Sequence, residues 1–230
     1  MNRQSFTNSV VRNIRLIPRS VLALMFAIAL AWALIDVAAW VFHWGDVSVA
    51  AWSFAPYVLL VTVAEYLAIT GIVGIQRSVA AYLRFAATWA AVLLPIAIAI
   101  GLLFSAPILG RGQALLFFVI GLVIAVALIA FLPAWPVAQA VSPRFVPPTR
   151  ILSATRGFRW GLVGMALVLA AMNRQDLVPA VKYAHDLGHA FAYAAAEAGI
   201  GTLSFVYAAT VAATAYIFAA RNDEGLYPPR

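Results

Sequence analysis

The sequence has no cysteine and very little charge: none of its 230 residues is cysteine, and only 10% are charged. The lack of cysteine excludes a disulfide scaffold and any cysteine-ligated metal or iron–sulfur site. A soluble domain is about a quarter charged, so a water-soluble globule and a disordered chain are also excluded. Neither a phosphate-binding glycine loop (GxxxxGK[ST]) nor the GxSxG pattern of a serine hydrolase is present. An integral membrane protein is the class that remains.

Long apolar runs account for the rest of the composition, which is 65% hydrophobic with a mean hydropathy of +0.96. A membrane-spanning helix needs roughly 20 mostly apolar residues, whereas a membrane barrel alternates apolar and polar positions. The runs here are continuous, which favours helices. We expect an all-α bundle, a single membrane domain over residues 1–230, with six transmembrane helices at about 21–42, 54–75, 85–105, 113–132, 149–172 and 201–220.

The fifth of these spans is the shortest as a clean apolar run, because residues 160–172 cover only about 20 Å at 1.5 Å per residue. We expect it to extend backward through Gly157 to Thr149.

Basic residues set the orientation, because cytoplasmic loops of membrane proteins are enriched in lysine and arginine. In the six-span arrangement one side carries twelve basic residues and the other three, namely Arg111, Arg174 and Lys182. We therefore expect both termini in the cytoplasm of a multi-pass protein. The net charge of +7 then reports topology and contact with anionic lipids, and no nucleic-acid partner is expected.

Three segments outside the spans are expected to lie at the membrane interface. Residues 5–20 place Phe6, Val10, Ile14 and Ile17 at helical spacing, and Pro18 marks the junction with the first span. Residues 133–159 begin with a stretch containing five prolines, which predicts an elbow or a kinked helix end, followed by a short amphipathic helix. Residues 179–198 are expected to form a helix on the outer surface, starting at Pro179.

Glu65 is the leading candidate for chemistry, since it lies near the middle of the second span. A charged group at that depth is costly and usually faces the interior of the bundle. Helical spacing puts Thr62, Tyr66 and Thr70 on a similar face, and Tyr207, Thr210 and Thr214 form a stripe on the sixth span. The alternatives are a proton or cation relay, a lipid-headgroup contact, or a polar clamp between helices.

Four arginines form a second cluster on the inner side. Each contributes about 1 kcal/mol of attraction to an anionic membrane surface. We expect them to contact lipid headgroups as well as to set topology: Arg144, Arg150, Arg156 and Arg159.

His185 and His189 are four residues apart in the sequence HDLGH, a spacing at which two histidines on a helix can share a metal. Zinc needs three or four protein ligands, so a third would have to come from elsewhere, such as His43 or Asp46. A solvated helix face is the favoured interpretation, and neither a metal nor another cofactor is expected.

The block from Pro133 to Trp160 also carries a resemblance. A proline-rich span end, an arginine-bearing elbow and the residues Ser153, Thr155, Arg156, Gly157 and Trp160 occur together. This combination resembles the glycerophosphoryl-diester-phosphodiesterase membrane-domain-like family of six-span bacterial inner-membrane proteins. The resemblance implies a membrane anchor or helper module in that membrane, without a hydrolase domain in these 230 residues and with no catalytic residue to carry over.

Three functions remain open on these observations. The favoured one is a non-catalytic module that interacts with anionic lipids, or that acts as a scaffold for a membrane-protein partner or for copies of itself. Small residues support it, including Ala208, Ala212 and Ala215, and Gly161 with Gly164, because they permit close helix approach. The alternative is a small transporter or channel that uses Glu65. An outer-face metal enzyme built on His185 and His189 is the third.

Overall fold

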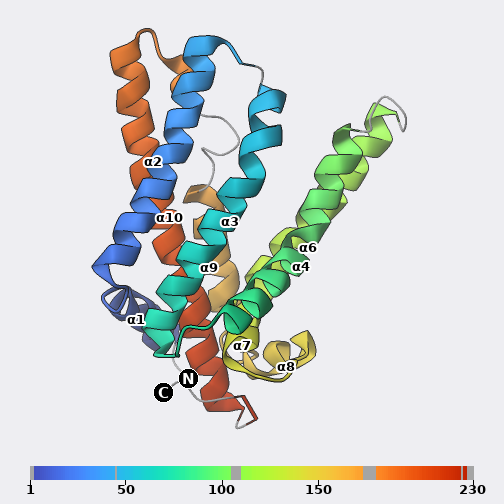
Figure 1. The fold of residues 1–230 in the computed structure, drawn as a ribbon. Coiled ribbons are helices and arrows are strands. Elements are labelled where there is room, and N and C mark those ends of the chain that lie inside the picture. The colour runs from blue at the N-terminus through green and yellow to red at the C-terminus, as the bar shows by residue number, and fades with distance from the viewer. Residues whose placement is uncertain (1–2, 45, 105–109, 173–179, 224, 227–230) are drawn as a thin grey trace. The chain divides into compact units, whose positions relative to one another are not determined.

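The computed structural model describes residues 3–44, 46–104, 110–172, 180–223 and 225–226. All regular structure in these ranges is helical, which confirms the expected all-α class (Figure 1). The helices are α1 (Arg3–Ile14), α2 (Arg19–Phe42), α3 (Asp46–Val73), α4 (Val79–Phe104), α6 (Arg111–Phe131), α7 (Ala134–Val141), α8 (Pro148–Ala154), α9 (Arg159–Met172), the 3₁₀ helix η2 (Ala180–Tyr183) and α10 (Leu187–Asn222).

Four helical stretches are long and apolar enough to cross a membrane. They are Arg19–Phe42, Ala55–Val73, Gly112–Phe131 and Leu187–Asn222. These stretches coincide with the first, second, fourth and sixth expected spans. Shorter apolar stretches occur at Val79–Pro95 in α4 and at Arg159–Leu169 in α9.

The chain forms two compact units. The first comprises Met1–Phe6, Gln76–Ala166 and Ala212–Arg230, and the second comprises Thr7–Ile75 and Leu167–Val211. Each unit therefore combines segments that are distant in sequence, and α1, α9 and α10 contribute residues to both.

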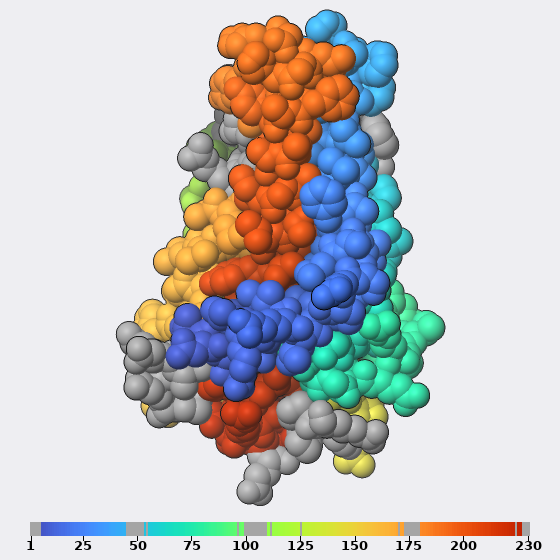
Figure 2. Space-filling model, turned by 90° about the vertical axis from the view of Figure 1, so that its left-hand side faces the viewer, coloured from blue at the N-terminus to red at the C-terminus, as the bar shows by residue number. Residues whose placement is uncertain are grey.

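Aromatic rings join the helices of the second unit. Trp32 of α2 stacks on Tyr57 of α3 with 4.0 Å between ring centroids, and Tyr57 also lies 6.3 Å from Phe205 of α10. The blue residues of α2 and the orange residues of α10 lie side by side in both views (Figures 1 and 2). Trp32 thus has the packing role that its depth in an apolar span suggests.

Helix α10 is one continuous helix of 36 residues, about 54 Å long at 1.5 Å per residue. The sequence predicted two elements here, an outer helix over residues 179–198 and a separate span over 201–220. The structure joins their helical parts, and only Ala180–Tyr183 forms a separate short turn. The alanine-rich stretch between them favours helix, and the Gly199 and Gly201 positions do not interrupt it.

In the first unit, α4 packs along α6, and α7 packs against α4 (Figure 1). Much of α6 is exposed, as expected for an apolar helix that faces lipid: Leu115, Leu116, Phe117, Val119, Ile120, Leu122, Val123, Ile124 and Val126.

The region expected as a fifth span over residues 149–172 is broken in the middle. Helix α8 ends at Ala154, a turn follows, and α9 starts at Arg159. The amide of Phe158 donates to the carbonyl of Thr155, which closes the turn. The Phe158 ring is buried, stacking on Phe6 of α1 at 5.1 Å and lying edge-on to Phe218 of α10 at 5.9 Å. This anchor explains why the apolar run does not continue as a straight helix.

Of the four apolar positions predicted to share a face in residues 5–20, Ile14 is only partly buried. Phe6, Val10 and Ile17 are buried, whereas Arg12 and Arg15 are exposed. Pro18 stands at the N-terminal boundary of α2 in an extended conformation, as predicted.

Candidate functional site

The proline-rich elbow of the first unit, residues 133–159, is held together by hydrogen bonds. Trp135 Nε1 and Gln139 Nε2 both donate to the carbonyl oxygen of Val146, at 2.8 and 2.6 Å. Arg84 Nε of α4 donates to the carbonyl of Gln139 at 2.9 Å. Gln139 is only 4% exposed, so its amide satisfies a buried backbone group that the prolines leave outside a regular helix. These hydrogen bonds give the elbow a defined conformation.

Two arginines of the elbow are exposed, and each has an exposed aromatic residue within four positions in the sequence. Arg144 is exposed and is followed by Phe145, which is 73% exposed. Arg156 is exposed, and Trp160, at the start of α9, is 70% exposed. Arginine with a neighbouring aromatic ring is the composition found at the headgroup level of membranes. Of the four predicted headgroup residues, these two are exposed, whereas Arg150 and Arg159 are partly buried.

Arg159 is turned toward the protein. Its Nη2 donates to the carbonyl of Leu152 at 2.5 Å, and its guanidinium carbon lies 6.0 Å from the ring centroid of Phe131. Its Nε is buried and, within the described parts of the chain, is the one buried side-chain nitrogen or oxygen without a hydrogen-bond partner.

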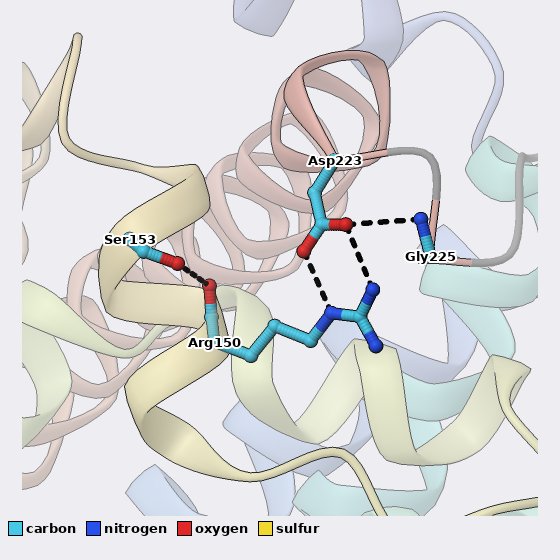
Figure 3. A network of polar contacts seen from close by, with 4 residues as sticks. All are labelled: Arg150, Ser153, Asp223 and Gly225. Carbon is cyan, nitrogen blue, oxygen red and sulfur yellow. Dashed lines mark hydrogen bonds and ion pairs between the residues drawn. The ribbon is translucent and has the colours of Figure 1, made fainter.

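Arg150 is also engaged inside the unit. Its Nε and Nη2 donate to the two carboxylate oxygens of Asp223 at 2.7 and 2.8 Å, a bidentate ion pair (Figure 3). The amide of Gly225 donates to the same carboxylate at 2.9 Å. The side chains of Arg150 and Asp223 are 40% and 23% exposed, so the pair remains in contact with solvent.

These contacts shift the titration of the acid. The hydrogen bond from Arg150 holds the pKa of Asp223 below its ordinary value, helped by the Gly225 amide and the arginine charge and opposed by partial burial. The carboxylate is thus ionised throughout the physiological range.

Glu65 is buried, as predicted, at 5% exposure in α3 of the second unit. Thr62, Tyr66 and Thr70 are buried beside it on the same helix. The hydroxyls of Thr62 and Thr70 donate to the carbonyls of Leu59 and Leu67 in their own helix, at 2.9 and 2.8 Å. These two protons are used within α3, which leaves the oxygens as acceptors.

The stripe predicted on the sixth span divides between the units. Thr210 belongs to the second unit, is fully buried, and donates to the carbonyl of Val206 at 2.5 Å. Tyr207 is half-buried in the same unit. Thr214 is fully buried but belongs to the first unit.

The HDLGH segment is the N-terminal cap of α10. The carboxylate of Asp186 accepts from the His189 amide at 2.8 Å and from His189 Nδ1 at 2.8 Å. These bonds lower the pKa of Asp186, with the backbone bond as the largest cause. The rings of His185 and His189 lie 6.1 Å apart. Among the described residues no three potential metal ligands gather at one place, so His43 does not complete a site there.

Sequence reasoning missed two acids that accept hydrogen bonds in the structure, Asp223 and Glu197. Asp223 was overlooked because its partner is 73 residues away. Glu197 is 8% exposed, and one of its carboxylate oxygens accepts from the backbone amide of Ala180, fastening η2 to α10 within the second unit. The presence of an acid in an otherwise alanine-rich helical run was the available signal for Glu197.

Comparisons with protein families, with curated proteins and with solved structures each found no match.

Proposed function

We propose that this protein is a non-catalytic integral membrane module that binds anionic lipid headgroups at its elbow. The observation that carries the proposal is the pairing of exposed arginine with exposed aromatic residues, Arg144 with Phe145 and Arg156 with Trp160, on the elbow.

The physical argument has two parts. Each arginine near an anionic surface contributes about 1 kcal/mol, and each amphipathic or aromatic ring favours the interfacial region. The hydrogen bonds of Trp135 and Gln139 to Val146 fix the elbow before lipid arrives, so less conformational entropy is lost on binding.

We propose a bacterial inner-membrane location, six crossings and cytoplasmic termini, which would put the elbow on the anionic inner leaflet. The fifth crossing is then α9, whose 14 residues span about 21 Å. Trp160 at its first turn would mark the inner boundary, and the bilayer would thin locally to match so short a helix.

The test uses the full chain with Arg144 and Arg156 both changed to glutamine. Binding of a short-chain phosphatidylglycerol to the detergent-solubilised protein is measured by the rise in melting temperature over a lipid titration, with phosphatidylcholine as the neutral comparison. Loss of two contributions of about 1 kcal/mol each weakens the apparent affinity about thirtyfold.

The matched control is Arg12→Gln with Arg15→Gln, which removes two exposed arginines, one in α1 and one just after it, and the same net charge. Equal loss in both double variants would mean that overall charge, and not the elbow, attracts the lipid, and the proposal would be abandoned.

A second candidate function rests on one observation, the burial of the Glu65 carboxyl inside the apolar stretch Ala55–Val73. A proton or cation path would use this group. Glutamine has the shape of the protonated acid but does not exchange a proton. Proton flux into vesicles that is present in wild type and lost in Glu65→Gln would establish a transporter; no wild-type flux, with an unchanged melting temperature in Glu65→Gln, would identify a packing role.

A further inference from the structure

The segment that follows α10 folds back onto α8 within the first unit. Asn222 Nδ2 donates to the carbonyl of Ala154 at 3.1 Å, and Asp223 pairs with Arg150. The Leu226 amide donates to the carbonyl of Asp223 at 3.0 Å, and the Leu226 side chain is buried at 2% exposure. Asn222 and Asp223 thus contact α8 through an amide hydrogen bond and an ion pair, and Leu226 is buried.

The ion pair between Arg150 and Asp223 has the same geometry as an arginine bound to a phosphate. A guanidinium binds a carboxylate and a phosphate in the same bidentate geometry, through two parallel N–H donors. The carboxylate of Asp223 therefore binds Arg150 in the way that the phosphate of a lipid headgroup would. Because the Arg150 side chain is 40% exposed, an incoming phosphate can reach it without opening the unit.

We propose that Asp223 is an internal competitor for lipid phosphate, so that Asn222, Asp223, Gly225 and Leu226 form a releasable latch over Arg150. This inference rests on the proposed function, since it assumes that anionic lipid gathers at the elbow. The latched state has two arginines of the elbow directed outward, Arg144 and Arg156. Release adds Arg150 to the lipid-binding surface.

Two substitutions open the latch by different means. Asp223→Asn removes the competing charge. Gly225→Ala changes no charge, but a Cβ at this position would overlap Nη2 of Arg150 and lie 2.6 Å from its guanidinium carbon, so the guanidinium must move away. Because the two variants share only the latch, a common effect cannot come from net charge.

Each variant has a matched control. Asp186→Asn makes the same charge change in the second unit and keeps a residue suited to capping α10. Gly161→Ala adds the same methyl group in α9 of the first unit, where no atom lies within 4 Å of the new Cβ. All four proteins and wild type are titrated in neutral detergent with short-chain phosphatidylglycerol, with short-chain phosphatidylcholine and with inorganic phosphate, by isothermal calorimetry.

We expect Asp223→Asn and Gly225→Ala to bind phosphatidylglycerol about fivefold more tightly than wild type, which is the effect of releasing an exposed ion pair. The controls should stay within about twofold of wild type. If wild type binds phosphatidylglycerol but the two latch variants bind it no more tightly, the latch is refuted and the proposed function survives. If none of the five proteins prefers phosphatidylglycerol to phosphatidylcholine, both the latch and the proposed function are refuted. Inorganic phosphate binding as tightly as the lipid would overturn the lipid as occupant.

A second measurement detects release of the latch directly and does not depend on a binding affinity. In the latched state the Gly225 amide donates to the carboxylate of Asp223 and the Leu226 amide donates to its carbonyl. Phosphatidylglycerol should accelerate hydrogen exchange at Gly225 and Leu226 in wild type by several-fold, and phosphatidylcholine should not. Unchanged or slower exchange under saturating phosphatidylglycerol would contradict release.

Discussion

Arg150 and Asp223 are 73 residues apart in the sequence and form a two-bond ion pair, with N–O distances of 2.7 and 2.8 Å. The pair ties the end of α10 to α8. The four arginines of the elbow are therefore of two kinds. Arg150 and Arg159 have hydrogen-bond partners within the unit, whereas Arg144 and Arg156 are exposed.

The ion pair predicts a pH dependence. Asp223 has a lowered pKa in the folded protein, so its stabilising contribution is complete above the ordinary aspartate value and is lost as the pH falls through the lower, folded value. Carbon-detected NMR titration of Asp223 should give a midpoint below 3.8. Arg150→Gln should move the midpoint upward, because the arginine hydrogen bond is the largest cause of the shift. A midpoint that does not move would show that Arg150 is not the partner in solution.

Gly71 is predicted to be intolerant of a side chain. A Cβ there would lie 3.0 Å from Cδ of Pro18 and 3.3 Å from the carbonyl oxygen of Leu16, where α3 approaches the chain between α1 and α2. Overpacking of this kind costs about 1–3 kcal/mol, so Gly71→Ala should lower the melting temperature. Gly199→Ala is the comparison, since no atom lies within 4 Å of its added Cβ, and it should not lower the melting temperature.

Gly161 and Gly164 test whether α9 packs against another molecule. The sequence suggested that these glycines permit close helix approach, but the structure places nothing within 4 Å of a Cβ at either one. If lipid covers this face, Gly161→Ala and Gly164→Ala should each stabilise the helix by up to about 1 kcal/mol. Loss of stability together with a change in oligomer mass would show instead that the face is an interface between copies.

The cap of α10 predicts the behaviour of the HDLGH segment. Asp186→Ala removes the acceptor of the His189 amide and should accelerate hydrogen exchange in the first turn of α10. Asp186→Asn should restore much of the protection. Added Zn²⁺ should leave the melting temperature of wild type unchanged; a rise that His189→Ala abolishes would revive the metal site.

The six-crossing topology predicts that Lys182 lies outside the cytoplasm. A periplasm-active reporter fused after Lys182 should be active, and one fused after Ser78, between α3 and α4, should be inactive. A cytoplasmic signal at Lys182 would reduce the number of crossings and would require a new orientation for α10.

The sequence predicts the features that depend on nearby residues. Continuous apolar runs predicted helices, and three of the four membrane-length stretches lie close to their expected bounds, while the fourth, Leu187–Asn222, starts well before the expected span over 201–220. Pro18 marked the start of α2, and the position of Glu65 within an apolar run predicted its burial. These properties follow from local composition and helical spacing, both of which can be read from neighbouring residues in the sequence.

Features that depend on distant partners could not be predicted in this way. The sequence predicted a turn at Gly157, but not that Phe158 would anchor it by packing against Phe6 and Phe218, which are more than fifty positions away on either side. The role of Asp223 required knowing that its segment returns to α8.

The most direct test of lipid binding at the elbow is native mass spectrometry of the protein released gently from its membrane. We predict that the wild-type protein retains at least one anionic lipid, and that the variant with Arg144→Gln and Arg156→Gln loses it while the Arg12→Gln, Arg15→Gln variant keeps it. A wild-type protein that carries no anionic lipid, or an elbow variant that retains as much as wild type, would contradict the account.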